Sequence, residues 1–225
     1  MQNRALGDKT LHNIANIILP DELVFDVGAN VGNKAQWFAD RGARVVAVEP
    51  QPAMVAALQE RFASNPHVTI VPKGLAEKPG HLDMHINTNT PVISTFSQQW
   101  TQGRFAGQSW DRVERIEMTT MDALVAEFGV PRYTKIDVEG FEKPVMLGLT
   151  TKIGAISLEF TSEFLQNTVD LLWYARGLGY RYFNLSIHER TDYLFPAWQS
   201  VDVIIEHLRD ICAKDHIAWG DVYAV

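Results

Sequence analysis

The sequence has very little cysteine, no excess of basic residues and no long apolar run. Its single Cys212 cannot form an intrachain disulfide, and no cysteine cluster offers a zinc site. Lys and Arg number 20 against 27 Asp and Glu, a net charge of −7, so nucleic acid is not an expected partner, although a local basic patch stays open. The apolar stretch before Pro20 is too short to span a bilayer and is not a signal peptide. We therefore expect a cytoplasmic protein without a membrane partner.

The 225 residues are 46% hydrophobic, which is ordinary globular composition. No repeat or linker divides them, and short apolar runs alternate with helical patterns. This alternation predicts an α/β fold, a single doubly wound domain with a mostly parallel sheet, whose last strand could be antiparallel. The strands expected in the main sheet are residues 23–27, 44–48, 67–71, 133–138, 153–160, 180–186 and 221–225. Residues 81–86 and 112–118 have the pattern of half-exposed strands, and residues 96–110 suggest a lid.

The strongest local signal is a glycine turn after the first strand, where residues 24–32 read VFDVGANVG. A dinucleotide fingerprint would need glycines in the order GxGxxG, which this segment lacks. Asp26 would repel phosphates but attract a cationic ligand, and Glu49 ends the second strand, where a carboxylate can accept bonds from both ribose hydroxyls. S-Adenosylmethionine has such a ribose and a cationic amino-acid part. Alternatively, Gly28 and Gly32 only make a tight turn and Glu49 is a solvated strand end.

A second acidic group closes the fourth core strand, where residues 135–140 read KIDVEG. With a period of two, Lys135, Asp137 and Glu139 share one face of the strand, at the sheet edge where ligands bind. A carboxylate placed there could act as a general base or grip a substrate, and Lys135 would lower its pKa. The alternative is an exposed strand end with a surface ion pair. Glu159 and His188 are weaker candidates.

Together these segments resemble the FkbM-type S-adenosylmethionine-dependent methyltransferases. The resemblance rests on VFDVGANVG (24–32), VEP (48–50), TTMDAL (119–124) and KIDVEG (135–140). It implies a Rossmann-like class I methyltransferase fold, with a seven-stranded sheet whose last strand is antiparallel. We therefore expect one methyltransferase domain over residues 1–225, with an N-terminal helix in 1–20, a cofactor-binding core in 21–160, and helices and strands completing the sheet in 161–225.

The resemblance also implies where S-adenosylmethionine binds and which groups act on the acceptor. Asp137 is the first choice of base and Glu139 the second. We assign no metal ligand, and a divalent ion is possible but not expected. The expected acceptor is a small molecule or glycan, methylated on a hydroxyl of a sugar or secondary metabolite. The expected cofactor-binding residues are Asp26, Gly28, Ala29, Asn30, Gly32, Glu49, Pro50, Gly74 and Leu75.

Three other functions remain open at this point. A nicotinamide-dependent oxidoreductase would share the fold and the ribose acid, but the glycine spacing and Asp26 argue against it. A non-catalytic module that binds S-adenosylmethionine would keep Asp26 and Glu49 and need no acceptor site. A nucleic-acid methyltransferase is disfavoured by the net charge.

Overall fold

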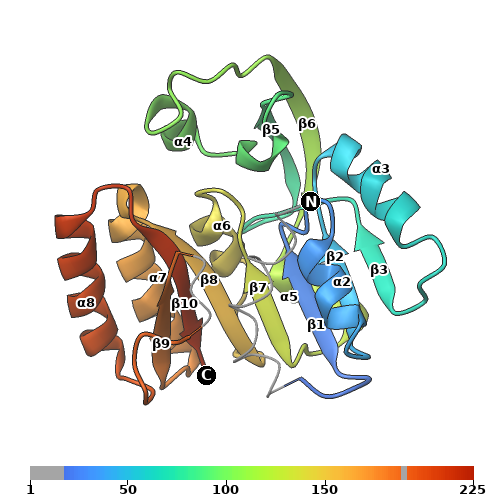
Figure 1. Ribbon diagram of the computed structural model, residues 1–225. Coiled ribbons are helices and arrows are strands. Elements are labelled where there is room, and N and C mark those ends of the chain that lie inside the picture. Colours follow the sequence, from blue (N-terminus) through green and yellow to red (C-terminus); the bar gives the residue numbers. More distant parts are fainter. Residues whose placement is uncertain (1–17, 189–191) are drawn as a thin grey trace.

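The structure, a computed structural model, describes residues 18–188 and 192–225 and is built on one large sheet (Figure 1). The helix expected in residues 1–20 lies outside the described residues, except that residues 18–20 are not helical. The strands of the sheet follow the order β3-β2-β1-β7-β8-β10-β9. Their bounds are Leu23–Val27 (β1), Arg44–Val48 (β2), Val68–Val71 (β3), Tyr133–Ile136 (β7), Ala155–Thr161 (β8), Phe183–Ile187 (β9) and Trp219–Ala224 (β10).

The direction of the strands confirms the predicted fold class. Neighbouring strands from β3 to β8 are all parallel, whereas β10 lies antiparallel between β8 and β9. The last strand therefore runs against the rest of the sheet. The sequence pattern alone left this direction open, and the family resemblance implied it.

Helices cover both faces of the sheet, and the alternation of side chains along each strand separates the two cores. In β1, Val24 faces the cluster formed with α2 and α3, whereas Phe25 and Val27 face the cluster formed with the other four helices. Thr120 caps one of these, α5, since its hydroxyl accepts a bond from the Ala123 N–H at 3.1 Å. The helices are Asn33–Ala39 (α2), Pro52–Arg61 (α3), Met121–Phe128 (α5), Glu142–Leu147 (α6), Leu165–Leu178 (α7) and Val201–Lys214 (α8).

A second, three-stranded sheet of order β4-β6-β5 lies beside the first. It comprises Gly74–Leu75 (β4), Gly80–Ile86 (β5) and Arg112–Thr119 (β6). The connection from β5 to β6 contains a 3-10 turn, Pro91–Ile93 (η1), and a short helix, Gln98–Gln102 (α4), which lie with β5 and β6 above the central sheet in Figure 1. The pattern predicted β5 and β6 but neither their pairing nor β4, because a two-residue strand has no periodicity.

One boundary that differs from the prediction bears on the site. Strand β7 ends at Ile136 and not at residue 138, although the Asp137 N–H still donates to Val27 O at 3.1 Å. Glu139 then adopts a φ of 55°, which is incompatible with a strand. Asp137 and Glu139 are therefore placed by a turn, and the two-residue period of a strand does not relate them.

Candidate functional site

A cavity opens at the carboxyl ends of β1, β2 and β7. The empty space in it, including open solvent at its mouth, is about 650 Å³. This is the edge of a parallel sheet where ligands commonly bind. The predicted residues that line it are Gly28, Asn30, Glu49, Pro50, Gly74, Leu75, Asp137 and Glu139.

Gly28 brings the first turn into contact with the end of β7. It has a φ of 81°, and a Cβ on it would lie 1.8 Å from the backbone oxygen of Asp137. The N–H groups of Gly28 and Ala29 both donate to Val48 O at 3.0 Å. The turn therefore needs glycine at position 28, because a side chain would collide with backbone that belongs to the same site.

The other three residues predicted from the glycine turn do not line the cavity. Ala29 is buried in the core with α2, and a Cβ on Gly32 would lie 2.6 Å from the ring of Phe62, so both positions serve packing. Asp26 is fully buried in β1. Burial raises the pKa of its carboxyl group, although the positive charge of Lys135 opposes this rise.

Glu49 is the buried acid of the cavity, only 2% exposed at the end of β2. Its Oε2 accepts the N–H of Asn30 at 2.8 Å, and its Oε1 accepts the N–H of Gln51 at 2.9 Å. Burial raises the pKa of Glu49 to about 7, although these two bonds oppose the rise. Each oxygen keeps a lone pair for a ligand, as the pairing with a ribose diol requires.

The opposite wall of the cavity is apolar. Leu75, Met84, Val92 and Phe96 line it, from β4, β5 and the connection that follows β5. A Cβ on Gly74 would lie 2.6 Å from Met118, so this glycine allows β4 to lie close to β6. Such a wall suits a flat heterocycle such as adenine. Our sequence analysis did not find Met84, Val92 or Phe96, because apolar residues in an irregular segment carry no periodic signal.

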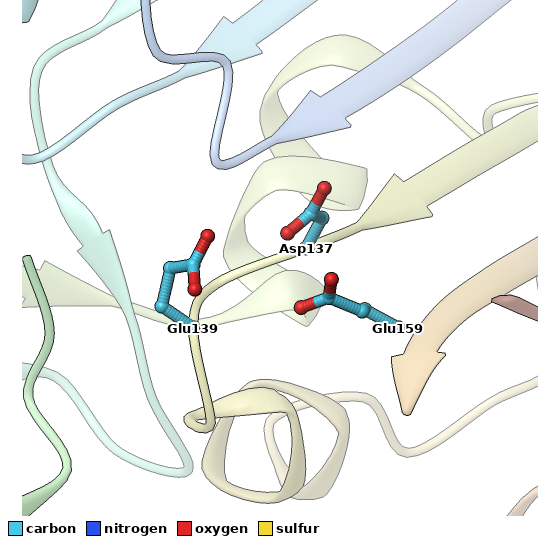
Figure 2. A group of neighbouring side chains, drawn as sticks. All are labelled: Asp137, Glu139 and Glu159. Atoms are coloured by element: carbon cyan, nitrogen blue, oxygen red, sulfur yellow. The ribbon is translucent and has the colours of Figure 1, made fainter. Parts of the chain in front are cut away.

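Three carboxylates lie together beside the cavity, of which Asp137 and Glu139 line it and Glu159 does not. Asp137, Glu139 and Glu159 point toward one another, and oxygen atoms of the three lie within 4.8 Å (Figure 2). Lys135 Nζ lies 2.6 Å from Asp137 Oδ2. Glu159, the weaker sequence candidate, thus joins the predicted pair. His188 is not among the described residues that line the cavity; its ring contacts Trp219.

The three acids differ in charge. Burial alone would raise the pKa of Asp137, but the adjacent Lys135 outweighs burial and lowers it. The pKa values of Glu139 and Glu159 are raised well above the ordinary range, by burial first and then by the charge of Asp137. The cluster therefore favours an ionised Asp137 beside Glu139 and Glu159, whose carboxyl groups hold their protons more strongly than usual.

This distribution of charge bears on metal binding. Three carboxylates this close could share a divalent cation, but Lys135 already bonds one oxygen of Asp137. We assign no metal ligand, and that assignment stays a prediction.

Two further residues that the sequence analysis missed shape the turn between β7 and α6. Glu142 Oε1 accepts the N–H groups of Val138 and Gly140, at 3.1 and 3.2 Å. Thr95 Oγ1 donates to the backbone oxygen of Glu139 at 2.7 Å. An acid just after a glycine turn could have suggested the first contact, whereas nothing local indicated the second.

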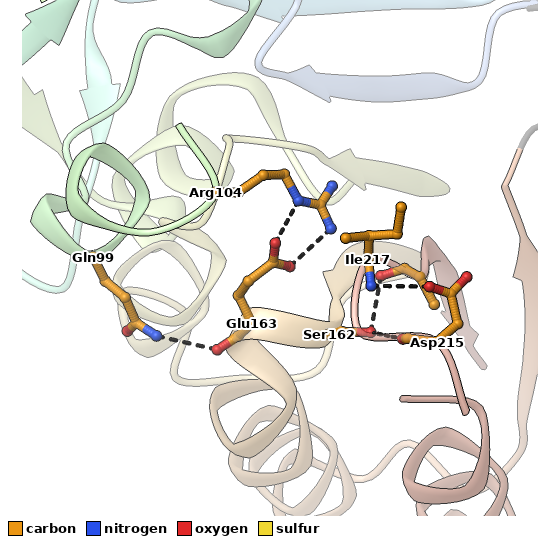
Figure 3. Close-up of polar contacts among 7 residues, drawn as sticks. Gln99, Arg104, Ser162, Glu163, Asp215 and Ile217 are labelled. Atoms are coloured by element: carbon orange, nitrogen blue, oxygen red, sulfur yellow. Dashed lines mark hydrogen bonds and ion pairs between the residues drawn. The ribbon is translucent and has the colours of Figure 1, made fainter. Parts of the chain in front are cut away.

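The connection after β5 is bound through Glu163 to the 3-10 turn Ser162–Phe164 (η2), which directly precedes α7 (Figure 3). Arg104 forms a two-pronged ion pair with its carboxylate, with Nη2 3.0 Å from Oε2, and Gln99 donates to its backbone oxygen at 3.1 Å. Trp100 stacks on Phe164, with ring centroids 5.6 Å apart. These contacts fasten the segment that the sequence analysis interpreted as a lid beside the acidic end of the cavity.

Comparison with protein families identifies the chain. The family model described as the Methyltransferase FkbM domain matches residues 26–182. The chain belongs to this family. The predicted recognition is thereby confirmed, and the match includes the glycine turn, Glu49 and the acidic cluster.

Solved structures confirm the fold. The chain resembles a precorrin-6y C5,15-methyltransferase from Geobacter metallireducens (13% identity, TM-score 0.50, 99% of this chain and 86% of that one). It also resembles a precorrin 8w decarboxylase from Methanobacterium thermoautotrophicum (14%, 0.51, 100% and 90%). A third similar structure is fibrillarin from Aeropyrum pernix with bound S-adenosyl-L-methionine (10%, 0.50, 93% and 68%). At these identities the likeness concerns the fold alone.

Curated relatives correct one prediction. The chain is 36% identical over 52 residues to a probable ribosomal RNA small subunit methyltransferase A from Methanosarcina mazei, covering 23% of this chain and 19% of that protein. It is 38% identical over 72 residues to the ribosomal RNA small subunit methyltransferase A from Geobacter metallireducens, covering 31% and 26%. The chain thus spans about a fifth to a quarter of these relatives. The prediction of partners without nucleic acid is wrong, since net charge averages over the whole chain and does not report the acceptor.

One finding concerns membranes. No helix in the described part of the chain combines the length and the apolar character needed to cross a bilayer.

Proposed function

We propose that this chain transfers the methyl group of S-adenosylmethionine to a hydroxyl group of a sugar or secondary metabolite. The observation that carries the proposal is that one cavity is lined by two different acids. Glu49 is buried, and Asp137 has a lowered pKa and is ionised. Glu49 suits a ribose, and Asp137 lies where the acceptor would meet the methyl group.

The cavity fits the donor in three respects. Glu49 offers a lone pair on each oxygen to the ribose, Leu75 and Phe96 offer an apolar wall to the adenine, and Gly28 leaves the first turn without a side chain. S-Adenosylmethionine, when bound, supplies an electrophilic methyl group whose leaving group is a neutral thioether.

The residues of the chain then have to align the acceptor and remove its proton. Asp137 is ionised at neutral pH and takes the proton of the acceptor hydroxyl as the oxygen forms its bond to the methyl carbon. Glu139, whose pKa is raised, can in its protonated form donate to another oxygen of the acceptor. Phe96 and Phe141, with ring centroids 5.2 Å apart, exclude water from the apolar side of the cavity.

A second candidate acceptor is RNA, because the curated relatives are named as ribosomal RNA methyltransferases. What Asp137 must do depends on which atom of the acceptor is methylated. A hydroxyl, including a ribose hydroxyl of RNA, needs a group that removes its proton, whereas a nucleobase nitrogen with a free lone pair does not.

The donor is tested first, by calorimetric titration of S-adenosylmethionine. Glu49→Ala should weaken binding by about 2–4 kcal/mol, because charge-assisted hydrogen bonds are lost. Glu60→Ala, an exposed acid of α3, is the control and should bind normally. A thermal shift with NAD and none with S-adenosylmethionine would instead favour the oxidoreductase.

The acceptor is tested next, by following S-adenosylhomocysteine formation with sugars, hydroxylated metabolites and structured RNA. On any accepted hydroxyl compound, Asp137→Asn should slow transfer by roughly a hundredfold or more while donor affinity changes little. Turnover with RNA alone would overturn the proposed acceptor class. Donor binding without turnover on any of these acceptors would support the non-catalytic module.

A further inference from the structure

Lys135 is a buried cation among carboxylates, and the proposed function gives it no role. Its side chain in β7 is only 7% exposed. The register places Asp26 of β1 beside it on one side and Ser157 of β8 on the other. Its Nζ lies 2.6 Å from Asp137 Oδ2.

The environment of this pair is predominantly acidic. Burial alone would lower the pKa of Lys135, but the negative charges of Asp137, Asp26 and Asp221 raise it above its ordinary value. Lys135 therefore stays charged at neutral pH. The charged and titratable groups around Asp137 are Asp26 (β1), Lys34 (α2), Lys135 (β7), Glu139 of its own turn, Glu142 (α6), Glu159 (β8) and Asp221 (β10).

We propose that Lys135 is the positioning residue of the acceptor site, which holds Asp137 ionised and in place through its ion pair with Oδ2. The inference rests on the proposed function, since it concerns the base named there. Without Lys135, the half-buried Asp137 would lie beside Glu139 and Glu159 without its cation and would take up a proton more readily. A protonated Asp137 cannot accept the proton of an acceptor hydroxyl.

The first test does not need an acceptor. The titration of the Asp137 carboxyl carbon is followed by ¹³C NMR in the wild type and in Lys135→Met, with Asp137→Asn identifying the signal. We expect the midpoint to rise by about two pH units or more in Lys135→Met, as for an acid that loses an adjacent cation in a buried site. An unchanged midpoint would overturn the inference.

Removing the cation that pairs with a partly buried carboxylate can prevent folding. The double variant Lys135→Met/Asp26→Asn carries one buried acid fewer, and Asp26→Asn alone is its reference. The same rise of the Asp137 midpoint is expected between these two proteins. Lys135→Arg keeps the cation and should restore a low midpoint.

The second test uses an acceptor identified in the screen and separates positioning from a merely structural role. Relative to the wild type, Lys135→Met should lose most rate at the acidic end of the pH range and recover as the pH rises above the raised midpoint of Asp137, where its carboxyl group ionises again. Added to Asp137→Asn, the lysine change should cost no further rate. An equal loss at every pH, or a further loss in the double variant, would show that Lys135 only supports the fold.

Lys143→Met is the matched control, since Lys143 forms an ion pair of the same 2.6 Å length with Asp170 away from the cavity. It should change neither the Asp137 midpoint nor the pH profile. The two proposals fail separately. If the Asp137 midpoint rises in Lys135→Met but the wild type turns over no acceptor, this inference stands and the proposed activity is refuted. If the wild type turns over a hydroxyl acceptor but the midpoint is unchanged in Lys135→Met, the proposed activity stands and this inference is refuted.

Discussion

At the scale of single residues, the glycine turn after β1 and the turn between β7 and α6 are in contact through Gly28. The space for its missing Cβ is occupied by the backbone oxygen of Asp137 at 1.8 Å. The glycine is therefore needed for the shape of the site itself, in addition to any approach of a ligand.

Gly28→Ala should both destabilise the protein and abolish donor binding. The new methyl group must displace either the turn or Asp137, and alanine also resists a φ of 81°. We expect a loss of roughly 2–4 kcal/mol in the free energy of unfolding, measured with urea. Calorimetry should detect no binding of S-adenosylmethionine.

Gly107→Ala serves as its control, because a Cβ there meets no atom within 4 Å. That variant should keep both stability and binding. Normal donor affinity in Gly28→Ala would mean that the donor binds away from this turn.

The position of a residue could be predicted where it follows directly from a strand that the sequence pattern identifies. Glu49 follows a clear strand, so its position at the sheet edge could be predicted, and it lines the cavity. Asp26 lies one strand period before Gly28, yet the sequence could not show that its side chain is buried beneath the cavity. The contact of Gly28 with Asp137 joins residues far apart in sequence, which no local pattern records.

At the scale of elements, contacts with distant residues hold the connection from β5 to β6 beside the cavity. One of them is the Arg104–Glu163 ion pair, which joins this segment to the 3-10 turn before α7, and its side chains are 23% and 22% exposed. A paired and partly buried Arg–carboxylate contact is worth on the order of 1 kcal/mol.

Arg104→Ala should therefore loosen this connection and leave the central sheet intact. Hydrogen exchange of residues 98–105 should become roughly several-fold faster, as about 1 kcal/mol implies, with the global unfolding temperature nearly unchanged. Mass spectrometry of the exchanged peptides gives the measurement. Lys214→Ala, which removes an exposed pair on α8, should leave these peptides unaffected. Equal exchange in Arg104→Ala would show that the aromatic contacts of Trp100 suffice.

The elements of the central sheet were predictable because apolar periodicity and buried position coincide in them. The connection from β5 to β6 was not, since its order depends on distant partners such as Phe164 for Trp100 and Glu139 for Thr95. The end of β7 was misplaced because Asp137 continues the alternation of the strand while its backbone already enters the turn.

At the scale of the whole molecule, buried acids make stability depend on pH. Burial raises the pKa of Glu49 and of Glu142 to about 7, and that of Asp221 to about 6. The unfolded chain loses these protons near about pH 4 to 4.5. Between about pH 4 and pH 7 the folded protein therefore binds more protons than the unfolded chain. The resulting stabilisation is fully present below about pH 4 and is lost as the pH rises through about 7.

The free energy of unfolding should therefore fall between about pH 5 and pH 8, by on the order of a few kcal/mol. Asp137, whose pKa is lowered, acts in the opposite direction only at lower pH. Urea unfolding at several pH values tests this expectation. Glu142→Gln stays neutral and keeps an oxygen for Val138 and Gly140, so it should flatten the curve. A stability that rises with pH in the wild type would contradict the assignment of buried neutral acids.

The pairing of β5 with β6 has a consequence for engineering. The two strands are paired in a continuous antiparallel register from Gly80–Met118 to Ile86–Arg112. The two ends of the connection, Ile86 and Arg112, therefore lie side by side. Whatever joins Ile86 to Arg112 can then change in length and composition without disturbing that register. Residues 87–111 also supply Val92 and Phe96 to the cavity, so exchanging this segment with that of a homologue should change how the cavity binds its ligands while the central sheet stays intact.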